Sequence, residues 1–118
     1  MKKKTVYLFG IILLLCAFTI KSNDKKVIGS WKVDKVTRQD GSEKKGRKTL
    51  TFTSDHKFVS KKDNGSEMKG TWELISEGDS LKMCDTTGYR CETFAIIELS
   101  KKSLILKDDR KTYYTSRK

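Results

Sequence analysis

The sequence predicts an all-β fold: a small antiparallel up-and-down barrel of about eight strands, preceded by an N-terminal hydrophobic segment. From residue 23 onward, short stretches of alternating apolar and polar residues are separated by turn residues at roughly 8- to 12-residue intervals, which is typical of antiparallel sandwiches and barrels. No 3.6-residue period is sustained there, so helices are not expected to build the core. The 118 residues contain no proline, and every strand residue can therefore donate its backbone N–H to a ladder.

The first 22 residues predict an export signal. Lys2, Lys3 and Lys4 precede an uncharged, apolar run of 15 residues from Val6 to Ile20, whereas a bilayer core needs roughly 20 helical residues. We therefore expect export to the bacterial periplasm, the outer membrane or the extracellular space. One outcome is cleavage near Ile20-Lys21-Ser22. Two alternatives stay open, and both imply membrane association through this segment: lipid attachment at Cys16, which ends an aliphatic run as in bacterial lipoproteins, and an uncleaved anchor.

Residues 23–118 are expected to form one domain, with its first three strands at 28–37, 48–53 and 57–61. In the first strand, Trp31 and Val33 share the inward face and alternate with charged residues. A polar, glycine-containing loop at 40–46 leads to the second strand, where Leu50 and Phe52 point inward between threonines that favour strands. Phe58 is the core residue of the third strand.

The clearest hairpin signal follows the third strand. Asn64-Gly65 accepts the positive φ angles of a type I′ turn and connects to a strand at 68–75. A second turn at 77–79 leads to a strand at 80–84. The residues expected to point inward from these two strands are Trp72, Leu74, Leu81 and Met83.

We expect a disulfide between Cys84 and Cys91, because exported proteins occupy oxidising compartments. It closes an 8-residue loop, for which chain entropy gives about 2.5 kcal/mol. The spacing does not suit zinc, and no metal is expected. A cross-strand pair shares one face, so both cysteines point outward and Phe94 points inward from a strand at 91–99. A bulge late in that strand would return Leu99 to the interior; the alternative is an inward Glu98 at the barrel mouth.

The last two strands are expected at 103–107, with Leu104 and Leu106 inward, and at 111–116. Short connections join all the predicted strands in sequence order. The simplest topology is therefore a meander that closes on itself, which removes the exposed edges of an open sheet.

Both ends of this domain carry residues of a known pattern. Gly29-Ser30-Trp31 opens the first strand and Arg117 follows the last. This G-x-W resembles the signature of lipocalins, in which the tryptophan closes the bottom of the barrel and a basic residue from the last strand covers its ring. Segments 50–58, 70–74 and 97–106 resemble the small lipocalin-like domains that bacteria export. The resemblance covers nearly all of 23–118 and implies structural roles for Gly29, Trp31 and Arg117.

The resemblance also implies a barrel that binds a small apolar molecule, or one that binds nothing. An eight-stranded barrel is just wide enough for its side chains to fill or to hold one small ligand, and a filled core is the default expectation here. The candidate ligand-lining residues are Trp31, Phe52, Phe58, Trp72, Phe94 and Glu98.

The positive charge does not indicate nucleic-acid binding. The net charge is +11, and it is +7 without residues 1–22. Lys and Arg are spread along the chain near acidic residues, whereas nucleic-acid proteins cluster them and interleave aromatics for stacking. We interpret the lysines as a solvated outer surface.

No catalytic constellation is evident. His56, the single histidine, follows Asp55 in a turn and is expected to be a solvated bystander. No cofactor is expected, and the chain is expected to be a non-enzymatic monomer. Two hypotheses remain: a protein that binds a small hydrophobic molecule in or at the mouth of the barrel, and a structural or protein-interaction module of the cell envelope with a filled core.

Overall fold

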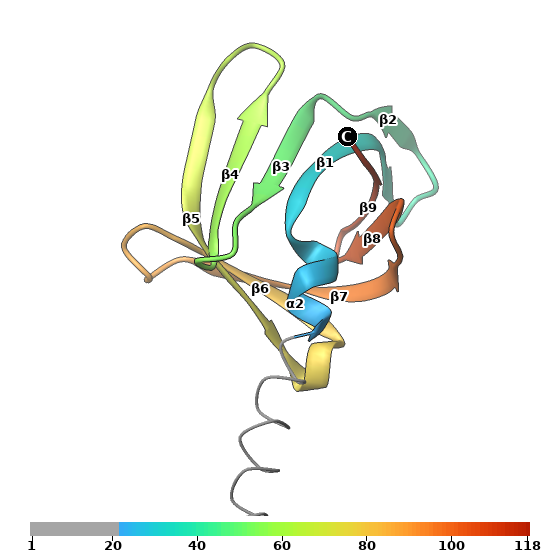
Figure 1. The fold of residues 1–118 in the computed structure, drawn as a ribbon. Helices are drawn as coiled ribbons and strands as arrows, with labels where there is room; N and C mark the ends of the chain where they lie inside the picture. The colour runs from blue at the N-terminus through green and yellow to red at the C-terminus, as the bar shows by residue number, and fades with distance from the viewer. Residues whose placement is uncertain (1–21) are drawn as a thin grey trace, which may run out of the picture.

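The structure is a computed structural model that describes residues 22–118 (Figure 1). Residues 1–21, which include Cys16 and the predicted apolar run, lie outside the described residues. A short helix, α2 (Ser22–Val27), precedes the strands. The strands are β1 (Gly29–Arg38), β2 (Glu43–Lys45), β3 (Lys48–Phe52), β4 (Lys57–Lys62), β5 (Glu67–Ile75), β6 (Ser80–Asp85), β7 (Cys91–Leu99), β8 (Ser103–Lys107) and β9 (Lys111–Arg117), with a 3₁₀ turn, η1 (Ser76–Gly78), between β5 and β6.

Eight of these strands close into an antiparallel barrel. The sheet order is β2-β1-β3-β4-β5-β6-β7-β8-β9, and an additional pairing of β1 with β9 completes the circle. The predicted fold class and strand sequence are confirmed. The extra strand β2 was expected to be loop. It pairs with residues 35–37 of β1, on the edge that β3 leaves free because β3 pairs only with residues 29–32.

The core is formed by the inward face of each strand, as the alternation predicts. The buried hydrophobic residues are Val27, Trp31, Val33, Leu50, Phe52, Phe58, Trp72, Leu81, Phe94, Leu104 and Leu106. Leu74 and Met83 are partly buried and pack against this cluster. Val27 is the one member that comes from α2, so the short helix is part of the core.

A β-bulge in β7 confirms the favoured interpretation of that strand. The register against β8 shifts between Ile96 and Glu98, and the extra residue, Ile97, is 58% exposed. The bulge returns Leu99 to the interior, where it packs against the core. Glu98 is exposed, so the alternative in which it points inward is wrong.

The β4–β5 hairpin is confirmed, but its predicted turn type is wrong. The positive φ angle is found at Gly65 (92°), and Asn64 is not among the positive-φ residues. Lys62 N–H donates to the Ser66 carbonyl and Gly65 N–H to the Lys62 carbonyl, both at 2.9 Å. Three residues thus lie between the closing pair, which gives a type I turn followed by a glycine bulge rather than a two-residue type I′ turn.

One end of the barrel is covered by α2, which lies beneath the strands in Figure 1. Val27 is fully buried, and its carbonyl accepts a 2.8 Å hydrogen bond from the Trp31 indole N–H. Within residues 22–118 no helix has the length and apolar character needed to cross a membrane.

Candidate functional site at the barrel mouth

Arg117 seals the same end that α2 covers. Its guanidinium carbon lies 4.0 Å from the centroid of the Trp31 ring. Nη1 donates to the Ile28 carbonyl at 2.7 Å, Nη2 to the Lys26 carbonyl at 2.8 Å, and Nε to the Lys101 carbonyl at 3.0 Å. The predicted pairing of Trp31 with Arg117 is therefore confirmed.

Gly29 is required at this closed end by its backbone and by its neighbour. Its φ angle is +131°, and a Cβ atom at this position would lie 2.3 Å from Nη1 of Arg117. Any other residue would be strained and would push the guanidinium away from the carbonyls that it binds. The glycine of the G-x-W pattern thus has a structural cause.

His56 also belongs to the closed end, and the interpretation of it as a solvated bystander is wrong. Its Nε2 lies 2.9 Å from Oδ2 of Asp24 on α2, and its ring stacks on Trp72 with 4.7 Å between centroids. The backbone of the turn that holds it has a positive φ of 63° at His56. His56 therefore connects α2 to the strands.

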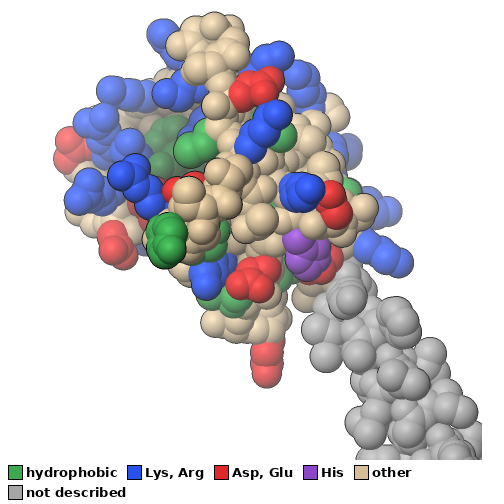
Figure 2. All heavy atoms as spheres, turned by 90° about the vertical axis from the view of Figure 1, so that its left-hand side faces the viewer, with side chains coloured by type: hydrophobic (Ala, Val, Ile, Leu, Met, Phe, Trp, Pro, Cys, Tyr) green, Lys and Arg blue, Asp and Glu red, His purple; other side chains and the backbone are tan. Residues whose placement is uncertain are grey.

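The opposite end is open and contains a cavity of about 580 Å³. Each strand from β3 to β9 contributes one apolar or aromatic side chain to its lining: Leu50, Phe58, Met68, Met83, Phe94, Leu106 and Tyr113. Figure 2 shows hydrophobic side chains within a hollow on this side of the molecule, with Lys and Arg side chains gathered beside it. We call this space the mouth cavity.

The candidate ligand-lining residues separate into two groups. Phe58 and Phe94 line the mouth cavity. Trp31, Phe52 and Trp72 do not line it; all three are at most 2% exposed and fill the deeper part of the barrel.

Glu98 lies outside the mouth cavity. It belongs to the half of β7 nearest the closed end, because the loop that follows supplies the Lys101 carbonyl bound by Arg117. Glu98 was expected at the barrel mouth on the assumption that β7 has no bulge, in which case the alternation along the strand would turn its side chain inward.

A basic surface adjoins the mouth cavity, and sequence reasoning missed it. This second space of about 1170 Å³ shares Lys48 and Tyr113 with the first. Its lining contains one acidic residue, Asp63. The basic residues of the lining are Arg38, Lys44, Lys45, Arg47, Lys48, Lys62 and Lys111. The lysines therefore do not all belong to a solvated outer surface.

Lys48 lies where the apolar and basic regions meet. Burial lowers the pKa of Lys48, and the charges of Lys111 and Lys62 lower it further while Glu92 acts in the opposite direction. Its Nζ lies 5.2 Å from the centroid of the Tyr113 ring. Burial likewise raises the pKa of Tyr113, whose ring meets Phe94 edge to face at 5.8 Å.

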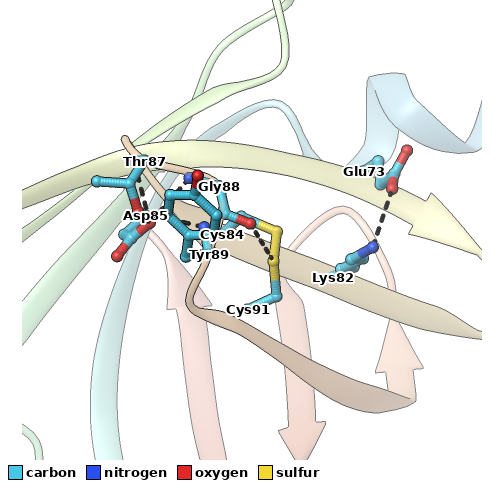
Figure 3. Close-up of a disulfide and its surroundings, with 8 residues drawn as sticks. All are labelled: Glu73, Lys82, Cys84, Asp85, Thr87, Gly88, Tyr89 and Cys91. Carbon is cyan, nitrogen blue, oxygen red and sulfur yellow. Dashed lines mark hydrogen bonds and ion pairs between the residues drawn. A yellow bond between two sulfur atoms is a disulfide. The ribbon is translucent and has the colours of Figure 1, made fainter.

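The β6–β7 hairpin borders the mouth, and its predicted disulfide is confirmed. Cys84 and Cys91 are directly opposite in register and are bonded to one another. The loop beyond them is held by Asp85, whose Oδ1 accepts hydrogen bonds from the backbone N–H groups of Thr87 at 3.1 Å and Gly88 at 3.0 Å (Figure 3). Hydrogen bonding from the Thr87 hydroxyl is the main cause that lowers the pKa of Asp85. The described residues contain no group of three potential metal ligands.

Solved structures with the same fold come from Bacteroides. A lipocalin-like protein from Bacteroides uniformis matches with a TM-score of 0.68 and 17% identity over 79% of this chain and 99% of that one. An uncharacterized protein from Bacteroides eggerthii gives 0.65 and 17%, over 78% and 99%. A further Bacteroides uniformis protein, solved by NMR, gives 0.59 and 20%, over 78% and 88%. No protein-family model matches the sequence, and no curated protein matches it significantly. The chain thus has a lipocalin-like fold, as the resemblance in its sequence implies.

Proposed function

We propose that this protein is a non-enzymatic, exported lipocalin-like protein that binds a small hydrophobic molecule at the mouth of its barrel. The observation that carries the proposal is the mouth cavity of about 580 Å³, lined by one apolar or aromatic side chain from each of seven strands. Small-molecule sites are concave, mostly apolar and of roughly 300–1,000 Å³.

The packing of the barrel supports a ligand at the mouth rather than one along the whole axis. Trp31, Phe52 and Trp72 occupy the interior next to the closed end. The Trp72 ring lies edge-on to Phe52 at 5.7 Å between centroids. These rings form a floor, so that a ligand would enter at the mouth and rest on Leu50, Phe58 and Leu106.

The chemistry of the site supports binding rather than catalysis. His56 lies at the closed end, where it contacts Asp24 and Trp72. It is therefore remote from the mouth cavity, where a substrate would be bound. Asp85, one of the two acids that line the mouth cavity, is engaged in holding the backbone of the loop between Cys84 and Cys91.

Export is supported by the basic start and apolar run of residues 1–22 and by the Cys84–Cys91 disulfide, since disulfides persist in oxidising compartments. Membrane association through the same segment, by lipid attachment at Cys16 or as an uncleaved anchor, is the alternative to cleavage of that segment after export.

The test uses the full chain, expressed in a bacterial host, and the neutral fluorescent probe N-phenyl-1-naphthylamine. Met68 lines the mouth cavity and is 58% exposed, so Met68→Trp can fill the cavity without overpacking the core. Thr71→Trp adds the same ring to an exposed position on the same strand. We expect probe binding to the wild type and to Thr71→Trp, and binding at least about tenfold weaker to Met68→Trp.

Either of two results would overturn the proposal: no probe binding by the folded wild type, or equal binding by both variants. Contributions from residues 1–21 are common to all three proteins and cancel in the comparison.

The second candidate is a structural or protein-interaction module of the envelope. The observation that favours it is exposed apolar surface beside the mouth, where Tyr89 is 93% exposed and Met68 58% exposed. Native mass spectrometry of the full chain after exposure to bacterial lipids separates the two. A retained apolar adduct supports the carrier, and a bare protein supports the interaction module.

A further inference from the structure

The mouth of the barrel carries its basic residues on the inward face of the strands. Lys48 precedes the inward Leu50 by two positions on β3, and Lys111 precedes the inward Tyr113 by two on β9. Lys62 follows the inward Phe58 and Ser60 on β4. Because strand residues two apart share a face, these three lysines extend the lining of the barrel upward from the apolar cavity.

Two like-charged pairs are built into the ladder at this end. Lys48 is directly opposite Lys62 in the β3–β4 register, and Arg38 is directly opposite Lys111 in the β1–β9 register. Like charges directly opposite one another destabilise a sheet. Two such pairs around one opening concentrate positive charge at an energetic cost to the free protein.

No ion pair within the described part of the chain holds these three lysines, although the charge of Glu92 acts on Lys48. Among residues 22–118, the ion pairs involve Lys35, Lys57, Lys82 and His56, and none involves Lys48, Lys62 or Lys111. The acids that border the mouth cavity, Asp85 and Glu92, come from β6 and β7. The inward-facing basic residues thus come from β1, β3, β4 and β9, whereas the disulfide hairpin contributes both of these acids and one basic residue, Arg90.

The cationic and apolar regions are continuous. Lys48 and Tyr113 line both the mouth cavity and the basic space beside it. The Lys48 ammonium lies 5.2 Å from the centre of the Tyr113 ring, whose other contacts include Phe94. An apolar group that rests on Phe58 and Phe94 would thus place an attached polar group next to Lys48.

We propose that the ligand is an amphipathic anion, whose apolar part occupies the mouth cavity and whose acidic group binds Lys48, Lys62 and Lys111. The proposal rests on the proposed function and adds the class of ligand. The acidic group is a carboxylate, sulfonate or phosphate, since each accepts charge-assisted hydrogen bonds from ammonium donors. Its arrival offsets the repulsion within the like-charged pairs.

The experiment compares ligands of equal chain length and opposite charge on the full chain by isothermal titration calorimetry. Dodecanoate and dodecyltrimethylammonium form the matched pair, and both are used as monomers in solution. Inorganic phosphate serves as an anion without an apolar part. One charge-assisted contact corresponds to roughly a tenfold change in affinity. We therefore expect dodecanoate to bind at least about tenfold more tightly than dodecyltrimethylammonium or phosphate.

Lys48→Met removes the central charge and keeps an apolar stem, and Lys32→Met removes the same charge from an exposed position of β1 outside both cavities. We expect Lys48→Met to weaken dodecanoate binding about tenfold and not to weaken the binding of dodecyltrimethylammonium, because the lost charge repels that cation. Lys32→Met should match the wild type. Unchanged near-ultraviolet circular dichroism verifies that both variants are folded.

The possible failures are distinguishable. If N-phenyl-1-naphthylamine binds but dodecanoate and dodecyltrimethylammonium bind equally, the anion preference is overturned and the hydrophobic site stands. If phosphate binds as tightly as dodecanoate, the site recognises anions without an apolar part, and the amphipathic ligand is overturned. If neither the neutral probe nor any amphiphile binds, the proposed function fails together with this inference.

Discussion

The guanidinium of Arg117 lies over the indole of Trp31 with 4.0 Å between its central carbon and the ring centroid. These two residues are also direct partners in the β1–β9 register. The same contact therefore joins the first strand to the last and covers the floor of the barrel. The side-chain contact that covers one end of the barrel thus lies on a pair of the β1–β9 ladder that closes the sheet.

Replacing Arg117 by lysine should destabilise the fold although the charge is kept. Arg117 donates to three carbonyls at once, and a lysine ammonium cannot reproduce that planar geometry. We expect a loss of about 1–3 kcal/mol in the free energy of unfolding, measured by urea denaturation. Lys118→Met, a change at the exposed neighbouring residue, should have little effect. Equal stability of the two variants would contradict the role assigned to Arg117.

Gly29→Ala should act largely through Arg117. The added Cβ would lie 2.3 Å from Nη1, so its cost has one part from the positive φ angle and another from displacing the guanidinium. In an Arg117→Met background only the first part remains. A double-mutant cycle of urea unfolding should therefore give a coupling free energy above about 0.5 kcal/mol. Additive costs would show that Gly29 is needed for its backbone alone.

The Cys84–Cys91 disulfide should stabilise the domain without being required for its topology. It connects residues that the β6–β7 ladder already places opposite one another. Its 7-residue separation along the chain gives an expected loss of about 2.5 kcal/mol on replacing both cysteines by serine. Thermal unfolding with far-ultraviolet circular dichroism at the start measures both effects. A variant that has lost its β spectrum at low temperature would contradict this expectation.

The free energy of unfolding should rise with pH through the titration of Lys48. Burial lowers the pKa of Lys48 from 10.5, so between the folded-state value and 10.5 the unfolded chain binds a proton that the folded chain has released. In that window the folded state gains stability as pH rises.

The comparison of wild type with Lys48→Met isolates this contribution. Tyr113, whose raised pKa acts in the opposite direction, is present in both proteins. Urea unfolding from neutral pH toward 10.5 should show the wild type gaining stability relative to the variant. A constant difference would mean that the Lys48 ammonium is as well solvated as in the unfolded chain.

Much of the barrel could be predicted because a two-residue period reports burial on one face. The alternation around Trp31, Leu50, Phe58 and Trp72 marked strands correctly, and the disulfide parity placed Phe94 inward. The two-residue period cannot mark a strand of which neither face is buried. Strand β2 has three exposed residues, and α2 has only six residues, too few for a helical period to be recognised.

The site was predicted less well because sequence alternation does not reveal which end of a barrel is covered. The alternation treats the five aromatics as equivalent, yet Trp31, Phe52 and Trp72 fill the deeper part of the barrel, and Phe58 and Phe94 lie at the open end. The signal for the basic mouth was present in the same alternation, since Lys48 shares the parity of Leu50 and Phe52. It was masked by the overall abundance of lysine, which favoured an outer-surface interpretation.

The most direct test of ligand binding at the mouth uses the methyl groups of methionine. Met68 and Met83 both line the mouth cavity, and the Trp31 indole N–H lies at the closed end, bound to the Val27 carbonyl. The full chain, labelled at methionine methyl carbons and at nitrogen, is titrated with dodecanoate and followed by NMR. The account predicts saturable shifts of the Met68 and Met83 methyl signals with the Trp31 indole signal unmoved. Shifts at Trp31 or at the exposed Ile97, with the two methionine signals unchanged, would contradict it.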